Sequence, residues 1–347
     1  MTGGLWVILI TIVLPRSAPA QHSPACTLSS EDVRWVQIAL DGWERVSRQL
    51  LRLEPKPLPW MVLYDASCVW HLAADARRVL ETSVANLTLT FAGEPVSARA
   101  GPHRGKVRLP NSSDIPPVGL AFGSLYEREP DDKEPFFVLA LLDVWRQNVK
   151  AAKDPRLPHT MLGVFSHEVV HTWQLEAVDR RVDELKQRYA VPQTVDDDVV
   201  ENRFKDVPGF REAHDSETDL FYAAASETDS ARRRQLVAKA LALVRARQSK
   251  YFTGPDEVYR ALEELFLNME GVAVWASFKL SQIDERFDIG VKDPVIERAR
   301  NTWSQDEGLA LFLLIDSMVP EWRERVLGPS LASPFALLEE AVRPPAR

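Results

Sequence analysis

The segment His167-Glu168-Val169-Val170-His171 combines residue types and a spacing that are suited to metal chemistry. Four residues are about one turn of an α-helix, so the two imidazoles project from the same face and can bind one metal ion together. Glu168 can accept a proton from a water molecule on such an ion. The arrangement H-E-x-x-H is typical of zinc hydrolases that use this glutamate as general base. The segment therefore predicts a zinc site with both histidines as ligands and Glu168 as the catalytic residue.

The alternative is a chance match on an ordinary amphipathic helix, and the neighbouring residues bear on it. Residues 161–165 are apolar, and four residues recur at helical spacing along one face: Val164, His167, His171 and Leu175. Ionisable groups on the inner side of a buried helix are costly unless a metal ion or other partners satisfy them. The context favours the metal site.

Two imidazoles do not complete a catalytic zinc site, which usually has three protein ligands and one position open to water. A third histidine close to the motif is excluded, because Gln174 and Ala177 stand where the three-histidine pattern requires glycine and histidine. A glutamate at short spacing is excluded too, since positions 190 and 191 are Ala190 and Val191. We therefore expect a carboxylate from farther along the chain.

Glu270 is the best candidate for that carboxylate. Its neighbours Gly271 and Ala273 are small, so their helix can approach the histidine helix closely enough for a short bond between Glu270 and the metal. Apolar residues share its side at helical spacing: Phe266, Leu267, Ala273 and Val274. An acid on an apolar face needs a partner, which a metal ion would provide. The alternative is a glutamate at the rim of a core helix.

The two segments resemble the gluzincins, H-E-x-x-H metallopeptidases whose third ligand is a glutamate on a later helix. Residues 167–174 are similar to the H-E-x-x-H-x-x-Q sequence of some members, and residues 270–275 to their E-G-x-A-x-aromatic turn. The resemblance implies a zincin-like fold and one Zn²⁺ per chain, bound by the two histidines and Glu270. The chain departs from the family at Val274, where some gluzincins have an acid that holds a ligand histidine. The groups that orient the ligands are therefore left unassigned.

A second segment has the same shape as the one around Glu270. Residues 307–312 also read Glu-Gly-x-Ala-x-aromatic, which makes Glu307 a rival for the third ligand. It follows the polar residues 304–306, however, and a carboxylate in the first turn of a helix is favoured without any metal. Glu201 and Glu217 are the remaining alternatives.

Motif and resemblance together predict a zinc-dependent peptidase that cleaves a peptide or protein substrate with a metal-activated water and Glu168 as general base. The candidates for stabilising the oxyanion are His214, Tyr222 and Tyr259, and the alternative for each is a structural role. The resemblance also implies an edge strand that pairs with the substrate; residues 136–141 are the candidate, unless they form a buried core strand. A different interpretation is a non-catalytic zincin-like protein that binds a partner, with the metal structural or absent.

The first residues of the chain predict export. Residues 5–14 form a run of apolar or near-apolar residues too short to span a bilayer comfortably, and the small residues of 17–20 follow. This pattern is typical of a signal peptide over residues 1–20, cleaved after Ala20, and implies a secreted or periplasmic protein. Residues 1–4 lack the usual Lys or Arg, so a buried N-terminal strand is the alternative.

Cys26 and Cys68 are the two cysteines of the chain. An even number in an exported protein permits one disulfide. The first precedes the opening helix and the second follows the first strand, so the two can meet. The alternative is two free buried thiols.

Composition limits the range of partners. A net charge of −8 gives no electrostatic footprint for nucleic acid. After the first residues, no stretch is long and apolar enough for a membrane helix. The oligomeric state has no signal in the sequence.

Periodicity predicts an α+β protein with strands first and helices after. A helix from Ser29 to about Leu53 precedes strands at residues 60–64, 87–91, 106–109, 118–122 and 135–141. Helices are predicted at residues 160–181, 229–247, 255–279, 304–317 and 333–342, and a loop at 191–208. We expect an N-terminal mixed-sheet subdomain, residues 21–176, that includes the histidine helix. A mainly helical subdomain, residues 177–347, then carries the third ligand.

Overall fold

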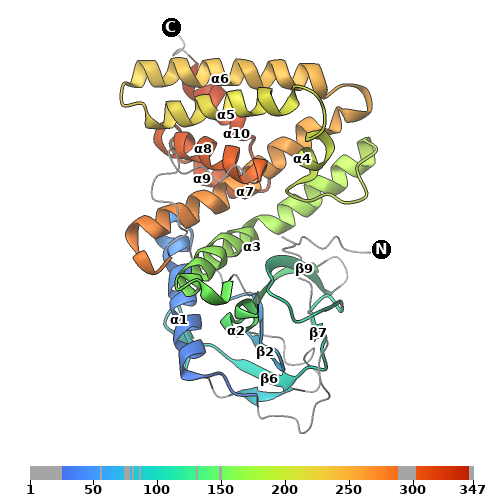
Figure 1. The fold of residues 1–347 in the computed structure, drawn as a ribbon, viewed down its shortest axis with the longest axis vertical. Helices are drawn as coiled ribbons and strands as arrows, with labels where there is room; N and C mark the ends of the chain where they lie inside the picture. Colours follow the sequence, from blue (N-terminus) through green and yellow to red (C-terminus); the bar gives the residue numbers. More distant parts are fainter. Residues whose placement is uncertain are drawn as a thin grey trace. The chain divides into compact units, whose positions relative to one another are not determined.

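The structure is a computed structural model that describes residues 26–343, apart from 55–56, 74–78, 80–81, 86, 130–131, 148–150 and 288–301. The predicted signal peptide lies outside the described residues. Contacts divide the chain into two units: unit 1 comprises residues 1–176 and 276–290, and unit 2 comprises 177–275 and 291–347. The division falls within two long helices, α3 (Leu157–Arg188) and α7 (Val258–Ile283), so each continues from one unit into the other (Figure 1).

Unit 1 contains a six-stranded mixed sheet with the strand order β3-β6-β2-β1-β10-β9. Its strands are β1 (Trp60–Tyr64), β2 (Cys68–Leu72), β3 (Ser83–Ala85), β6 (Ala98–Pro102), β9 (Ala121–Glu129) and β10 (Asp132–Ala140). β1 and β10 are parallel, and the other pairs of this sheet are antiparallel. Two small sheets pair β4 (Thr90–Phe91) with β5 (Glu94–Pro95), and β7 (Val107–Arg108) with β8 (Asp114–Ile115).

The strand predictions succeed where an apolar run is long. β1 has its predicted bounds, and β10 includes most of residues 135–141. The expectation that residues 136–141 form an edge strand is wrong, because β10 lies between β1 and β9 and its apolar half is buried. The predicted strand at 118–122 begins only at Ala121, and β2 and β6 have no predicted counterpart.

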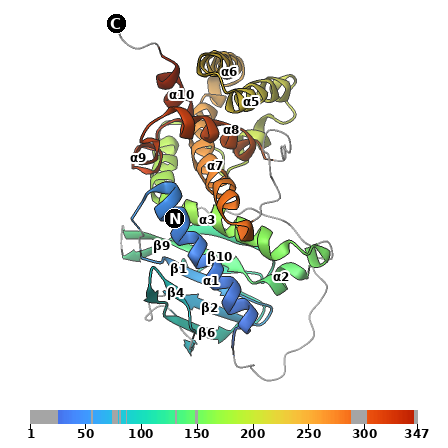
Figure 2. The same cartoon turned by 90° about the vertical axis from the view of Figure 1, so that its left-hand side faces the viewer.

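Helices α1 (Ser30–Arg45) and α3 cover one face of this sheet (Figure 2). The Ser29 side chain accepts a hydrogen bond from the backbone N–H of Asp32, which fixes the start of α1. Trp43 of α1 then makes edge-to-face contacts with aromatic rings of β10 and α3: Phe137, Phe165 and Trp173. The helix continues into a π-helical turn, Val46–Leu51, within the predicted range.

Two contacts between distant parts of the chain stabilise unit 1, and a short segment links its sheet to α3. Cys26 and Cys68 form a disulfide that joins the residues before α1 to β2. After α7, the 3₁₀ turn Glu285–Phe287 brings the Phe287 ring onto Gly42 of α1. The short helix α2 (Leu142–Arg146) and the 3₁₀ turn Ala151–Lys153 connect β10 to α3.

Unit 2 is mostly helical. It contains α4 (Val199–Phe204), α5 (Phe210–Ser226), α6 (Ser230–Tyr251), α8 (Trp303–Met318), α9 (Trp322–Leu327) and α10 (Pro334–Val342). α5 packs on α6 and α8, and α10 packs on the same two helices. The α+β class with a mixed sheet followed by a mostly helical part is thus confirmed. Among the described residues, no helix is long and apolar enough to cross a membrane.

Two helices of unit 2 differ from the predictions for physical reasons. Within the predicted loop 191–208, the buried residues Val199, Val200 and Phe204 form one side of the short α4. α5 was not predicted, because polar residues stand among the apolar ones on its buried face: His214, Glu217 and Thr218. Glu217 is paired there with the buried Arg247 of α6, whose Nε lies 2.7 Å from Glu217 Oε1.

Candidate metal centre

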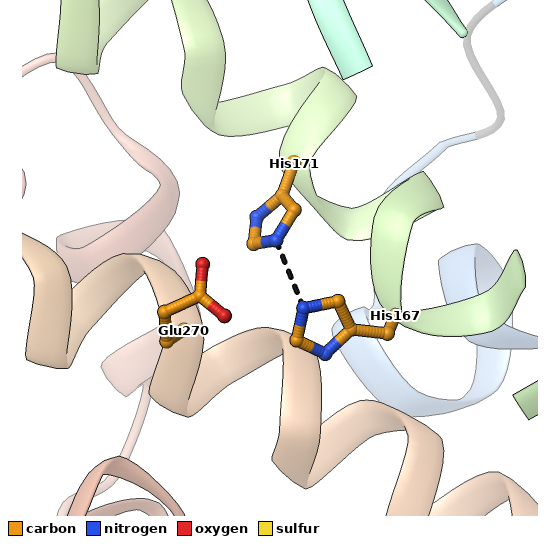
Figure 3. A group of neighbouring side chains, drawn as sticks. All are labelled: His167, His171 and Glu270. Atoms are coloured by element: carbon orange, nitrogen blue, oxygen red, sulfur yellow. Dashed lines mark hydrogen bonds between the residues drawn. The ribbon is translucent and has the colours of Figure 1, made fainter. Parts of the chain in front are cut away.

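Helix α3 brings His167 and His171 together. Because they are four residues apart, both rings leave the same face of the helix. Their Nε2 atoms lie 3.1 Å apart, and the ring planes are nearly perpendicular at 86° (Figure 3). The exposed fractions are 8% for His167 and 4% for His171, so both residues are buried.

Glu270 of α7 completes a group of three donors. One nitrogen from each histidine and one carboxylate oxygen of Glu270 all lie within 4.8 Å of one another. In Figure 3 the carboxylate faces the two rings. Only 2% of Glu270 is exposed, and a buried carboxylate is costly unless a cation or donors stabilise its charge. This cluster could hold a metal ion.

The spacing of the nitrogens fits donors that share one ion. With bonds of about 2.0–2.1 Å, two nitrogen ligands of a tetrahedral ion lie about 3.3 Å apart, close to the 3.1 Å between the Nε2 atoms. Two imidazoles and one carboxylate bind several divalent transition metals. The donor set therefore indicates a divalent transition-metal ion but does not select one metal.

Gln174, one turn after His171, determines which nitrogen of that histidine is available. Its Oε1 lies 3.1 Å from His171 Nδ1 and can only accept, so His171 donates from Nδ1–H. In the neutral ring, Nε2 then keeps its lone pair, and this is the atom that faces His167. The hydrogen bond therefore holds His171 in a tautomer that can bind a metal.

Gln305 of α8 plays a corresponding part for the third donor. Its Nε2 donates to Glu270 Oε2 over 3.1 Å. Neither of these two roles was predicted from the sequence. The position of Gln174 next to the motif is a local signal, whereas the contact of Gln305 depends on how α7 and α8 pack.

Glu168, the predicted general base, is buried on α3 directly after the first donor. The helix here lies against β9. A Cβ atom placed on Gly123 of that strand would be 3.2 Å from Leu175 Cδ1, 3.8 Å from His171 Cβ and 3.9 Å from the carbonyl oxygen of Glu168. Gly123 therefore allows the strand to approach the helix segment that carries the motif.

Glu307, the rival ligand, does not belong to the three-residue cluster. It lies on α8, where its Oε2 is 3.1 Å from Nε2 of His214. Its neighbour Gly308 packs on Gly271, and a Cβ on Gly271 would lie 2.9 Å from Gly308 Cα. The two similar segments are thus the two sides of one contact between α7 and α8. We expected Gly271 to face the histidine helix, and this was wrong: its small size serves the contact with α8.

Three of the other candidates, His214, Tyr222 and Glu201, contact the first turn of α8. Burial lowers the pKa of His214, but the carboxylates of Asp215 and Glu307 more than offset this and raise it to about 9. The hydroxyl of Tyr222 donates to the carbonyl oxygen of Asp306 over 2.9 Å. Glu201 accepts a hydrogen bond from the backbone N–H of Trp303 over 3.2 Å.

Tyr259 and Glu217 are the other two candidates in unit 2. Tyr259 packs edge-to-face against Phe204, and burial raises the pKa of its hydroxyl. Burial also raises the pKa of Glu217, although its partner Arg247 opposes the shift, and the value is about 8. Neither residue is among the three clustered donors.

The acidic residues Asp197 and Asp198 lie close enough to Glu270 for their ionisation to be coupled to its charge. Burial, together with the charges of Glu270 and of the neighbouring aspartates, raises the pKa of Asp197 to about 8. The pKa of Asp198 is raised to about 6 by burial and by nearby acids that include Glu201 and Glu270. The run of three aspartates was visible in the sequence, but its proximity to Glu270 depends on the fold of unit 2.

Comparisons with known proteins give no further information about this cluster. No model of a protein family matches the chain, and neither the curated proteins nor the solved structures include a match. The function of the protein must therefore be inferred from the described residues.

Proposed function

We propose that this protein is an exported zinc-dependent peptidase of the gluzincin type. The observation that carries the proposal is the convergence of His167, His171 and Glu270, three buried donors whose ligand atoms lie within 4.8 Å of one another. Three protein ligands that leave one position for water are typical of catalytic zinc. Zinc, when bound, would lower the pKa of a water molecule towards neutrality and polarise the carbonyl under attack.

The chain's own residues supply the proton transfers. Glu168 accepts a proton from the attacking water and passes it to the leaving amine. Its side chain is buried directly after His167, the first metal donor on α3. Gln174 keeps His171 in the required tautomer throughout.

A peptide is the substrate that best fits the neighbouring strand. Among the described residues, β9 is the outermost strand of the six-stranded sheet, which is the position at which an extended chain can add as a further strand. Gly123 of β9 lies against the motif helix. Sequence resemblance to the gluzincins and the order of a mixed sheet, a histidine helix and a later glutamate helix support a zincin-like fold. The disulfide between Cys26 and Cys68 supports export to an oxidising compartment.

The first test separates metal binding from catalysis. Glu168→Gln should retain one zinc per chain, measured by elemental analysis, while cleavage of a peptide mixture, followed by mass spectrometry, falls by about 10²–10⁴-fold. Glu176→Gln is the matched control, because it makes the same change at an exposed site on α3. His167→Ala should lose the zinc, and the exposed His159 of α3 provides its control, His159→Ala.

Each other outcome has a distinct meaning. If the purified wild type binds no zinc, the metal site is excluded. If it binds zinc through His167 but cleaves no peptide, the non-catalytic interpretation replaces the peptidase. If Glu168→Gln cleaves as fast as the wild type, Glu168 is not the base.

A further inference from the structure

The first turn of α8 lies beside the third donor. Gln305 Nε2 donates to Glu270 Oε2 over 3.1 Å, and Glu270 is buried. An ionised carboxylate can only accept hydrogen bonds, so Gln305 must present its amide N–H to it. A hydrogen bond in this place restricts the rotation of the Glu270 carboxylate and so sets where its oxygen atoms lie relative to the two histidines.

The position of this turn is fixed by contacts that do not depend on a metal. Gly308, one turn after Gln305, packs on Gly271, the residue next to Glu270. A Cβ on Gly308 would be 2.7 Å from Gly271 Cα, so the two helix backbones are in contact. Phe312, one turn further on, would be 2.6 Å from a Cβ on Gly271. α8 therefore cannot approach α7 more closely, and small residues are required on both sides.

Other partners hold the turn from its remaining sides. Glu201 accepts a hydrogen bond from the backbone N–H of Trp303 at the start of α8. Two residues of α5 contact successive residues of α8. Tyr222 donates a hydrogen bond to the carbonyl oxygen of Asp306, and His214 is paired with Glu307. Gln305 stands between these anchored residues, which restricts where its amide can point.

We propose that Gln305 is a positioning residue that orients the Glu270 carboxylate for metal binding. The proposal rests on the metal site of the proposed function, but it does not require peptide cleavage. Gln305 acts on Glu270 as Gln174 acts on His171, except that one amide donates and the other accepts. The same substitution, Gln to Glu, therefore has opposite consequences at the two positions.

The test measures Zn²⁺ affinity by competition with a chromophoric chelator. Gln305→Met keeps the length of the side chain but removes the donor, so affinity should fall about 10–100-fold. Gln305→Glu should weaken binding further, since a second carboxylate would repel Glu270. Gln174→Glu should bind Zn²⁺ at least as tightly as the wild type, because a carboxylate is a stronger acceptor for the Nδ1–H of His171.

The controls separate positioning from folding. Gln282 is exposed on α7, the same helix as Glu270, so Gln282→Met and Gln282→Glu should leave Zn²⁺ affinity unchanged. The melting temperature of the metal-free Gln305 variants should remain within about 2 °C of the wild type, because Gln305 is only half-buried. The absorption spectrum of the Co²⁺ form should change in Gln305→Met, which reports altered ligand geometry at Glu270.

Two results would overturn the inference in different ways. Wild-type affinity and an unchanged Co²⁺ spectrum in both Gln305 variants would show that Gln305 does not position Glu270, while the proposed function would stand. A wild type that binds neither Zn²⁺ nor Co²⁺ would remove the proposed function and this inference together.

Discussion

His71 of β2 is a buried histidine that the metal centre does not use. Burial lowers its pKa to about 4, and its Nδ1 accepts a hydrogen bond from Trp60 Nε1 over 3.0 Å. The neutral ring is therefore part of the folded state. Between its ordinary pKa of about 6.5 and the folded value, the unfolded chain binds one more proton than the folded chain, so stability must fall as the pH falls through this range.

We predict that acidification from pH 7.5 to 4 lowers the free energy of unfolding by up to about 3 kcal/mol through His71 alone, because the unfolded chain takes up the proton first. Urea unfolding of wild type and His71→Asn should show this, with a chelator present so that bound metal does not contribute. The variant is less stable at neutral pH but should lose less stability on acidification. Equal pH dependence in both proteins would show that His71 titrates normally.

At the level of single residues, local signals predicted part of the site. The spacing of His167 and His171 on one helical face, and Glu270 as an acid among apolar residues, were readable because they depend on neighbours within about two turns. The role of Gln305 could not be predicted in this way, because its contact with Glu270 joins two different helices. The wrong expectation that Gly271 faces the histidine helix has the same cause. The sequence shows that a residue is small, but it does not show which helix approaches it.

At the level of elements, the contact between α7 and α8 gives the clearest prediction. Alanine normally favours a helix over glycine by about 1 kcal/mol, but a Cβ on Gly308 would lie 2.7 Å from Gly271 Cα. Because backbone cannot move aside cheaply, Gly308→Ala should lower the free energy of unfolding by about 1–3 kcal/mol, measured by urea denaturation. It should also weaken Zn²⁺ binding, since Gln305 and Glu270 would be pushed apart.

Ser317→Ala provides the comparison for that variant. Ser317 is exposed near the end of α8, so the substitution should leave stability unchanged or raise it slightly. If Gly308→Ala were as stable as Ser317→Ala, the backbone contact between α7 and α8 would not exist in solution.

Elements were predictable where their buried face is apolar. The apolar runs of β1 and α8 gave strand and helix with bounds close to those observed. α5 was missed because part of its buried side is polar. His214 and Glu217 find their partners on other helices, and a pattern of hydrophobic residues along one segment cannot show such pairing.

At the level of the whole molecule, the order of strands and helices could be predicted from the composition along the chain. The segments that together form unit 1 could not be predicted. Residues 276–290 belong to it through contacts with segments far away in the sequence. Ser277 Oγ donates to the carbonyl of Gly163 over 3.3 Å, and Phe287 packs on Gly42. These contacts join parts of the chain that share no local pattern.

The disulfide of unit 1 makes stability depend on the redox environment. Cys26 and Cys68 are 42 residues apart in the sequence. In the chain-entropy description, closing a loop of this length in the unfolded state stabilises the fold by about 4 kcal/mol. Reduction with dithiothreitol, or the double variant Cys26→Ser and Cys68→Ser, should therefore lower the free energy of unfolding by an amount of this order. Urea denaturation followed by tryptophan fluorescence measures it.

The double variant also provides the control for the reductant. Dithiothreitol should destabilise the wild type and leave the variant unchanged, because the variant has no cysteine left to reduce. An exported chain should then fold in higher yield in an oxidising compartment than in a reducing one, and the variant should show no such difference. If reduction left the wild type as stable as before, the disulfide would not contribute to the fold, and the structural argument for export would be lost.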